Sequence, residues 1–164
     1  MEPTYRKSLL RDITDIKRII NEDSSDLQKT FLTNDIETEI NYIFSASVSP
    51  NIANQLFTIE YDSKIVGFVQ FFGFNQLESS VKLGYYLDKE HRGKGLLYNI
   101  CTELIDMNFK NGSIKKIYSI ITFNNKSSIK FIQKLNFRLE KRIFTFNITN
   151  FLKGKNLRLY SLSK

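Results

Sequence analysis

The chain has no tryptophan, one cysteine, one histidine and two prolines among its 164 residues. A lone cysteine forms no disulfide within the chain, and one cysteine with one histidine is too few for a structural zinc site. No run of about 18 apolar residues occurs, and the first residues lack the apolar core of a signal peptide. We therefore expect no metal, no membrane span and a cytoplasmic location.

What is present is typical of one folded domain. The apolar fraction is 41%, the charged fraction 25%, and 14 Phe and 8 Tyr supply large side chains for a core. We expect a single domain over residues 1–164. The net charge of +7 attracts anionic partners, but no block of five or six Lys or Arg occurs, so we expect no direct binding of nucleic acid.

Hydrophobic periodicity and turn residues predict the order β-α-α-β-β-β-α-β-α-β-β. Strands are expected at residues 5–11, 55–61, 65–74, 80–87, 116–122, 137–147 and 156–162. Helices are expected after a cap at Thr14 and Asp15, from Asn34 to about residue 44, from Leu97 to a stop at Gly112, and after a cap at Asn124 or Asn125. The order predicts an α/β fold whose central mixed sheet has six to seven strands flanked by about four helices.

The most informative segment joins the fourth strand to the third helix and reads Arg92-Gly93-Lys94-Gly95-Leu96-Leu97. Glycines let a backbone approach an anion closely, and a helix N-terminus presents unpaired N–H groups with a partial positive charge. The turn therefore suits a pyrophosphate. It has neither the Gly-Lys-Ser/Thr of a P-loop nor the third glycine of a dinucleotide fingerprint, and a tight turn with solvated charges is the alternative.

This segment resembles the phosphate-binding motif Q/R-x-x-G-x-G/A of the GNAT superfamily of N-acetyltransferases. Arg92 and Gly95 match the motif, and Leu97 replaces its final small residue. Two further segments resemble the family: Gly-Tyr-Tyr-Leu-Asp at residues 84–88, and Asn-Lys-Ser-Ser at 125–128 followed by Phe-Ile-Gln-Lys-Leu-Asn-Phe at 131–137. The likeness covers almost the whole chain and is nearest to the branch that acetylates ribosomal proteins on alanine or serine.

The resemblance implies a site for acetyl-coenzyme A as co-substrate. The backbone amides that would grip its pyrophosphate belong to Arg92, Gly93, Lys94, Gly95, Leu96 and Leu97. Its pantetheine arm would pair beside Tyr86 and Leu87, and a backbone N–H near Leu87 would donate to the thioester oxygen. Asn125 stands where a family residue binds the cofactor, although a helix N-cap is an equal explanation of this residue.

The resemblance also implies candidates for proton transfer. Many members use a Tyr where this chain has Ile132, which carries no proton to donate, so Ser128 is the candidate acid; a hydroxyl bonded within its own helix is the alternative. Glu78 is the candidate base, with an ordinary solvated loop residue as the alternative. His91 is expected in a loop and Cys101 in the core.

The function implied is transfer of an acetyl group to a primary amine by direct attack, with a protein N-terminal α-amine of the ribosomal-protein type as the expected acceptor. Two alternatives stay open: a small amine such as an antibiotic or polyamine, and a catalytically inactive module that binds coenzyme A. The partner is thus an acceptor protein or a small amine, and a homodimer is possible through the last hairpin.

Overall fold

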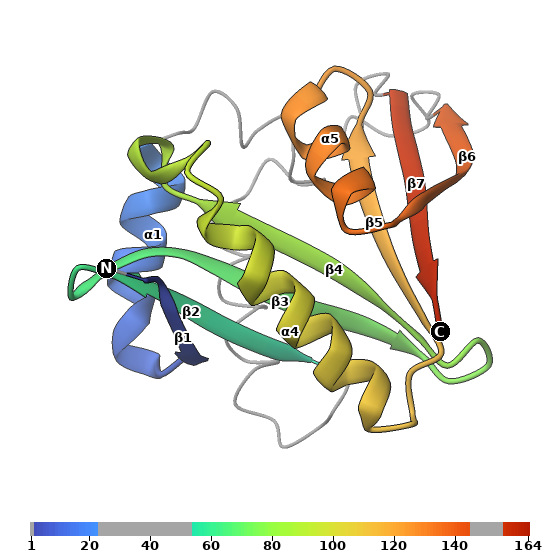
Figure 1. Cartoon of the computed structure of the whole chain (residues 1–164), viewed down its shortest axis with the longest axis horizontal. Helices are drawn as coiled ribbons and strands as arrows, with labels where there is room; N and C mark the ends of the chain where they lie inside the picture. The colour runs from blue at the N-terminus through green and yellow to red at the C-terminus, as the bar shows by residue number, and fades with distance from the viewer. Residues whose placement is uncertain (1, 23–53, 145–155) are drawn as a thin grey trace, which may run out of the picture.

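A computed structural model describes residues 2–22, 54–144 and 156–164 of the chain (Figure 1). The strands form one seven-stranded sheet in the order β1-β2-β3-β4-β5-β7-β6. They are β1 Thr4–Lys7, β2 Gln55–Tyr61, β3 Lys64–Asn75, β4 Ser80–Leu87, β5 Lys116–Thr122, β6 Arg138–Phe144 and β7 Asn156–Ser163. The helices are α1 Ile13–Glu22, α4 Leu96–Lys110 and α5 Lys126–Lys134, with short 3-10 turns at Leu10–Asp12 and Lys89–His91. Within the described ranges no helix is long and apolar enough to cross a membrane.

The sheet is mixed, as the sequence predicts. Strands β1 to β4 form an antiparallel meander, β4 runs parallel to β5, and β7 lies antiparallel between β5 and β6. The parallel pair is joined through α4, which is the predicted strand–helix–strand crossover. The structure confirms the α/β class and the seven-stranded sheet, whereas the helix expected from Asn34 to about residue 44 lies outside the described residues.

Each face of the sheet has its own hydrophobic core. The larger core lies between the sheet and the helices α4 and α5, which stand in front of the sheet in Figure 1. The smaller core lies on the opposite face, where Ile16, Ile19 and Ile20 of α1 are at most 2% exposed and pack with Phe68 and Tyr86. Strand residues alternate between the two faces, so neighbouring side chains of β4 belong to different cores.

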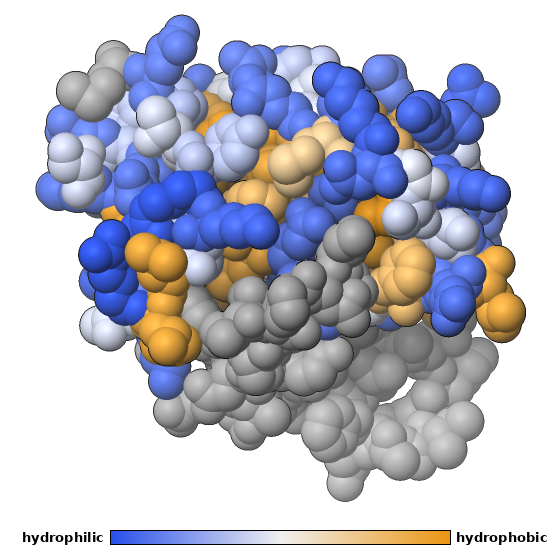
Figure 2. Space-filling model, turned by 90° about the horizontal axis from the view of Figure 1, so that it is seen from below, coloured by the Kyte–Doolittle hydropathy of each residue, from blue (hydrophilic) through white to orange (hydrophobic). Residues whose placement is uncertain are grey.

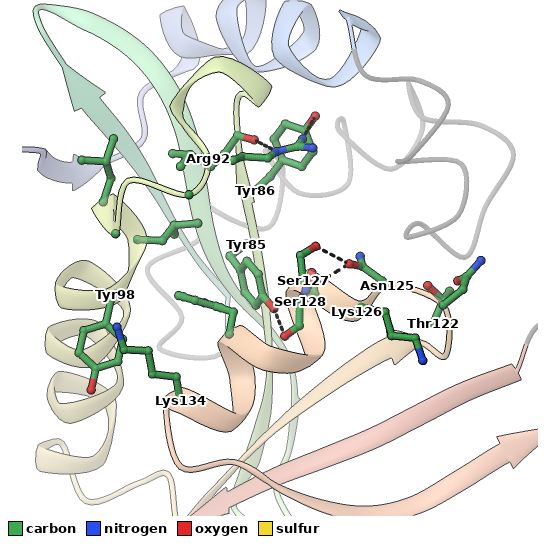
Figure 3. Close-up of a pocket in the computed structure, with 17 residues that line it drawn as sticks. Tyr85, Tyr86, Arg92, Tyr98, Thr122, Asn125, Lys126, Ser127, Ser128 and Lys134 are labelled. Carbon is green, nitrogen blue, oxygen red and sulfur yellow. Dashed lines mark hydrogen bonds between the residues drawn. The ribbon is translucent and has the colours of Figure 1, made fainter.

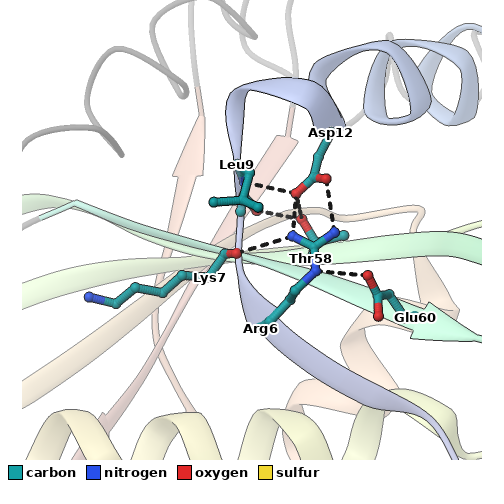
Figure 4. Close-up of polar contacts among 7 residues, drawn as sticks. Arg6, Lys7, Leu9, Asp12, Thr58 and Glu60 are labelled. Carbon is teal, nitrogen blue, oxygen red and sulfur yellow. Dashed lines mark hydrogen bonds and ion pairs between the residues drawn. The ribbon is translucent and has the colours of Figure 1, made fainter.

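The N-terminal segment differs from its prediction. The first strand ends at Lys7 instead of residue 11, and the chain enters α1 through the turn Leu10–Asp12, not through a cap at Thr14 or Asp15. The cause is Asp12, which is 1% exposed (Figure 4). Its carboxylate accepts two hydrogen bonds from Arg6, at 2.7 and 2.9 Å, and one each from the Leu9 N–H and the Thr58 hydroxyl. These bonds turn the chain two residues earlier than the hydrophobic pattern indicates.

The two central strands part after a short paired stretch. Strands β4 and β5 pair only where Ser80, Val81 and Lys82 face residues 116–118, and the two arrows then diverge in Figure 1. At the fork the Ser119 hydroxyl donates to the Leu83 carbonyl at 3.3 Å. This bond stands in the place of the next backbone hydrogen bond between the two strands. Beyond it, toward Leu87, β4 and β5 are no longer paired.

Hydrophilic side chains cover most of the described surface on the side of the molecule seen in Figure 2. The large hydrophobic side chains that are more than one third exposed are scattered along the described chain: Leu9, Leu10, Phe74, Leu77, Phe123 and Leu139. Leu9 and Leu10 are adjacent in the sequence and the other four are separate, and single exposed hydrophobic residues are common in folded domains.

Candidate functional site

A cavity of about 600 Å³ occupies the opening between β4 and β5 (Figure 3). Its walls come from the end of β4, from the turn that begins α4, and from the end of β5 with the first turn of α5. The lining residues are Tyr85, Tyr86, Leu87, Arg92, Gly93, Gly95, Leu96, Leu97, Tyr98, Thr122, Asn124, Asn125, Lys126, Ser127, Ser128, Phe131 and Lys134.

The turn before α4 presents bare backbone to the cavity. Gly93 and Gly95 have φ of 76° and 78°, in the left-handed region that glycine adopts most readily, and Gly95 is the N-cap residue of α4. A Cβ atom built at either glycine would meet nothing within 4 Å. The first turn of α4 carries no acidic residue, so its partial positive charge is not offset there. This concave backbone at a helix N-terminus suits a phosphate group.

The side chain of Arg92 is directed back to β4. Its Nε donates to the Leu87 carbonyl and its Nη2 to the Tyr86 hydroxyl, both at 2.8 Å, and the guanidinium lies 5.0 Å from the Tyr86 ring centroid. Tyr86 in turn stacks on Phe68 in the smaller core. Arg92 therefore fixes the end of β4 as well as adding positive charge to the cavity.

The edge of β4 that faces the opening presents backbone groups to it. The carbonyls of Leu83 and Leu87 both point to this side, since they accept from Ser119 and Arg92, whereas the N–H of Asp88 points away to Val66. Because backbone groups of a strand alternate in direction, the N–H of Leu87 also faces the opening. An extended ligand can pair with this edge as an added strand would.

The opposite wall is the first turn of α5, where Asn125 is the N-cap. Its Oδ1 accepts from the Ser128 N–H at 3.1 Å and from the Ser127 hydroxyl at 3.0 Å. The N-cap explanation of Asn125 is thus confirmed, and the amide nitrogen of its side chain takes no part in the cap. Ser128 is half-buried beside it, and among the described residues no hydrogen bond engages its Oγ.

Tyr85 closes the floor between the two walls. Its ring packs edge-on against Phe131 at 4.8 Å between centroids, and its hydroxyl donates to the Ser128 carbonyl at 3.3 Å. Burial raises the pKa of Tyr85, so the phenol is neutral near pH 7.

The charged side chains that line the cavity in the described ranges are all positive. Arg92, Lys126 and Lys134 are its cations, and no Asp, Glu or His side chain occurs among the lining residues in the described part of the chain. Lys134 lies with its Nζ 4.3 Å from the ring centroid of Tyr98. Thr122, 8% exposed at the end of β5, has a buried Oγ1 with no hydrogen-bond partner in that same part of the chain.

The cavity collects most of the residues that the sequence singled out. Its lining includes Tyr86, Leu87, Arg92, Gly93, Gly95, Leu96, Leu97, Asn125 and Ser128. Lys94 belongs to the same turn but is exposed and does not line the cavity.

Glu78 lies elsewhere, in the turn that precedes β4. Its Oε2 accepts from the hydroxyls of Ser80 and Tyr118. It stands at the paired end of β4, and the cavity is at the open end, roughly 23 Å away for a strand of this length. The structure does not bring this carboxylate to the cavity, and we leave it out of the proposed site.

Several lining residues are not among the site residues that the sequence predicts: Tyr85, Tyr98, Thr122, Asn124, Lys126, Ser127, Phe131 and Lys134. A usable signal existed for two of them, because Lys126, Lys130 and Lys134 recur every four residues and so follow one side of α5. No sequence pattern marks Thr122, whose place in the site results from the parting of β4 and β5.

Comparison with known proteins identifies a family for this architecture. Residues 9–138 match the model of the acetyltransferase (GNAT) domain. A curated relative, the "Putative ribosomal N-acetyltransferase YdaF" of Bacillus subtilis (strain 168), is 23% identical over 77 residues, which are 47% of this chain and 42% of that protein. The alignment thus spans less than half of the relative's length.

Solved structures share the fold over nearly the full chain. The microcin C7 self-immunity acetyltransferase MccE in complex with acetyl-CoA and AMP has a TM-score of 0.82 and 23% identity, covering 99% of this chain and 93% of that one. The Salmonella typhimurium acetyltransferase that modifies the N-terminal serine of ribosomal protein L7/L12 has a TM-score of 0.84 and 15% identity, and the match covers 100% of this chain and 96% of that one. The Vibrio cholerae spermidine N-acetyltransferase in complex with CoA and spermine has a TM-score of 0.81 and 18% identity, and the match covers 99% of this chain and 95% of that one.

Proposed function

The chain belongs to the GNAT acetyltransferase family, and from this premise we propose that it transfers the acetyl group of acetyl-coenzyme A to the α-amine of a protein N-terminus. The family and the co-substrate are those that the sequence predicts. Solved relatives of the same fold are described as acting on a ribosomal protein or on spermidine, so the acceptor has to be argued from this chain's own cavity.

The cavity fits the co-substrate at both of its distinctive parts. Gly93 and Gly95 leave room where any other side chain would project, and the amides that open α4 suit the pyrophosphate. The open edge of β4 from Leu83 to Leu87 suits the amides of the pantetheine arm, which would add to the sheet in the place that β5 vacates. Lys126 and Lys134 on the facing helix add positive charge toward a phosphate-rich ligand.

Bound acetyl-coenzyme A supplies the acetyl group as a thioester, from which the amine displaces the thiol. The N–H of Leu87 is the proposed donor to the carbonyl oxygen, where negative charge develops. The Oγ of Ser128 is the proposed donor of the proton that the departing sulfur takes up, because it lines the cavity and holds no other hydrogen bond among the described residues. The proton that the attacking nitrogen loses as the amide forms then restores the serine hydroxyl. Ile132, at the position of the family's tyrosine, is fully buried and has no proton to give.

One observation carries the choice of acceptor: no carboxylate or imidazole lines the cavity in the described ranges. An amine must be neutral to attack. An α-amine with a pKa of about 8 is roughly one quarter neutral at pH 7.5, whereas a lysine-like amine with a pKa of about 10.4 is only about 0.1% neutral. With no carboxylate or imidazole among the described lining residues, the cavity favours an α-amine, whose neutral and reactive fraction is about two-hundredfold larger. The cations Arg92 and Lys126 add a second preference, since they repel a polyamine.

The test compares amines under one assay. Acetyl-coenzyme A and the protein are incubated with peptides that begin with Ser or Ala, with the same peptides blocked at the N-terminus, and with spermidine, while free thiol is followed. We expect thiol release with the unblocked peptides only. Release with spermidine alone would identify a small-amine acetyltransferase, and binding of coenzyme A without release for any amine would identify a binding module. Mass spectrometry for a gain of 42 Da locates the acetyl group.

A pair of neighbouring serines tests the proton donor. Ser128→Ala should lower kcat about a hundredfold, the lower range for loss of a general acid, and leave the Kd for coenzyme A unchanged. Ser127→Ala is the matched control, because Ser127 lies in the same helical turn and its hydroxyl is bonded to Asn125. Equal rates for the two variants would remove Ser128 from the mechanism.

A further inference from the structure

The positive charge of this protein is concentrated in its last quarter. Residues 123–164 hold ten Lys or Arg and a single acidic residue, Glu140. Residues 1–122 hold 14 Lys or Arg and 16 Asp or Glu. The part of the chain that carries α5, β6 and β7 therefore accounts for the whole net charge of +7.

Part of this charge surrounds an exposed aromatic ring. Phe123, between β5 and α5, is 47% exposed. The Nζ of Lys126 lies 5.0 Å from its ring centroid and the Cζ of Arg158 on β7 lies 5.5 Å from it. Arg142 on β6 faces Arg158 across the ladder, so both arginines are on the same face of the sheet. We call Phe123, Lys126, Arg142 and Arg158 the Phe123 surface.

The described part of the chain places no carboxylate in an ion pair with these cations. Glu140 is bonded instead to Lys116 at 3.0 Å. Among the described residues no ion pair engages Lys126, Arg142 or Arg158. Like charges placed together on a surface repel each other, and their repulsion is relieved when an anionic partner binds.

The Phe123 surface is continuous with the candidate site. Lys126 belongs to both, and Asn124 beside Phe123 also lines the cavity. Arg142 and Arg158 are not lining residues, and the turn that suits the pyrophosphate is on the opposite wall. The two arginines are therefore available to a second molecule that enters the same cavity from its rim.

We propose that the Phe123 surface docks an acidic segment of the polypeptide whose N-terminal amine is acetylated. The inference rests on the proposed function and specifies its acceptor: an α-amine followed by Asp or Glu residues. Arginines bind carboxylates through two parallel hydrogen bonds, and the ring offers a flat apolar contact for the intervening side chains. A single ring with three cations suits a short acidic peptide better than a nucleic acid, which is usually held by several stacking rings along a charged groove.

The test uses two peptides that share their first three residues and differ afterwards, one with three Glu and one with three Gln, each labelled at the C-terminus. Fluorescence anisotropy with protein saturated with coenzyme A should show the Glu peptide binding more tightly. The double variant Arg142→Gln/Arg158→Gln should weaken the Glu peptide about five- to tenfold and leave the Gln peptide unchanged, as expected for two exposed ion pairs. Lys64→Gln/Lys110→Gln removes the same charge from exposed sites elsewhere and should change neither.

Three results would overturn the inference: equal affinity of the two peptides, equal losses in the two double variants, or tighter binding of a labelled oligouridylate that the arginine variant abolishes. Anisotropy requires no acetylation, so a protein that binds the Glu peptide but acetylates nothing would contradict the proposed function alone. Where the peptide is acetylated, the arginine variant should raise the KM for the Glu peptide and leave kcat unchanged, because the surface does not touch the reacting atoms.

Discussion

Replacing Gly95 by alanine should greatly weaken the binding of coenzyme A at a small cost in stability. The residue has φ of 78° and ψ of 0°, so a side chain there strains the backbone by about 1–2 kcal/mol. A Cβ would meet nothing within 4 Å, so no clash adds to this cost. For a domain of this size the strain corresponds to a fall in Tm of about 2–8 °C.

The loss of affinity is expected to be far larger. The added methyl projects from the concave turn into the space proposed for the pyrophosphate. It would break at least two hydrogen bonds from backbone amides to a charged group, each contributing about 1.5–3 kcal/mol. A loss of 3 kcal/mol or more raises the Kd by about a hundredfold or more.

Gly112 provides the matched control. It lies just beyond the other end of α4, has φ of 74°, and likewise would place a Cβ in open space. Gly112→Ala should therefore lower the Tm by a similar amount and leave the affinity for coenzyme A unchanged, as measured by differential scanning fluorimetry and isothermal titration calorimetry. Equal affinities of the two variants for coenzyme A would refute the assignment of the turn to the pyrophosphate.

Three further predictions concern buried polar groups. Burial alone would raise the pKa of Asp12, but hydrogen bonds from Arg6, Leu9 and Thr58 outweigh it and hold that pKa below its usual value. The carboxylate therefore stabilises the fold above about pH 4 and loses its contribution as the pH falls through the lowered folded-state pKa. Asp12→Asn should cost about 2–3 kcal/mol at pH 7 and less at pH 3, measured by urea unfolding; an equal cost at both would contradict the argument. Burial raises the pKa of the Cys101 thiol to about 12, so iodoacetamide at pH 8 should modify it only after unfolding, and rapid labelling of the native protein would reopen a reactive role. Thr122→Val removes a buried hydroxyl that has no partner in the described part of the chain and should raise the Tm by about 2–4 °C; a lower Tm would show that the hydroxyl is satisfied.

The sequence predicts the helices and strands of this fold better than it predicts how they are arranged around the cavity. The starts of β2 and β4 and the stop at Gly112 follow from local alternation and turn residues, which act over a few positions. The predicted start of α1 was wrong because hydrogen bonds from Arg6 and Thr58 hold Asp12 in place, and Thr58 is 46 residues away in the chain. A contact between residues so far apart produces no periodic pattern in the sequence.

In the candidate site, too, the parts set by local sequence are predicted and the parts set by distant contacts are not. The turn around Gly95 and the cap at Asn125 are local motifs, and the sequence predicts their places. Glu78 was selected because it lies two residues before β4, but eight residues of extended strand separate it from the open end. The parting of β4 and β5 decides which end of the strand carries the cavity. At the point where the strands separate, the Ser119 hydroxyl donates to the Leu83 carbonyl, a contact between residues 36 positions apart.

The same parting has a consequence for handling the protein. A strand whose edge is unpaired is a template on which another chain can add, and β4 keeps such an edge in the middle of its sheet. Concentrated protein without ligand should therefore tend to associate through this edge, and coenzyme A should act as a protective additive during purification and storage by covering it.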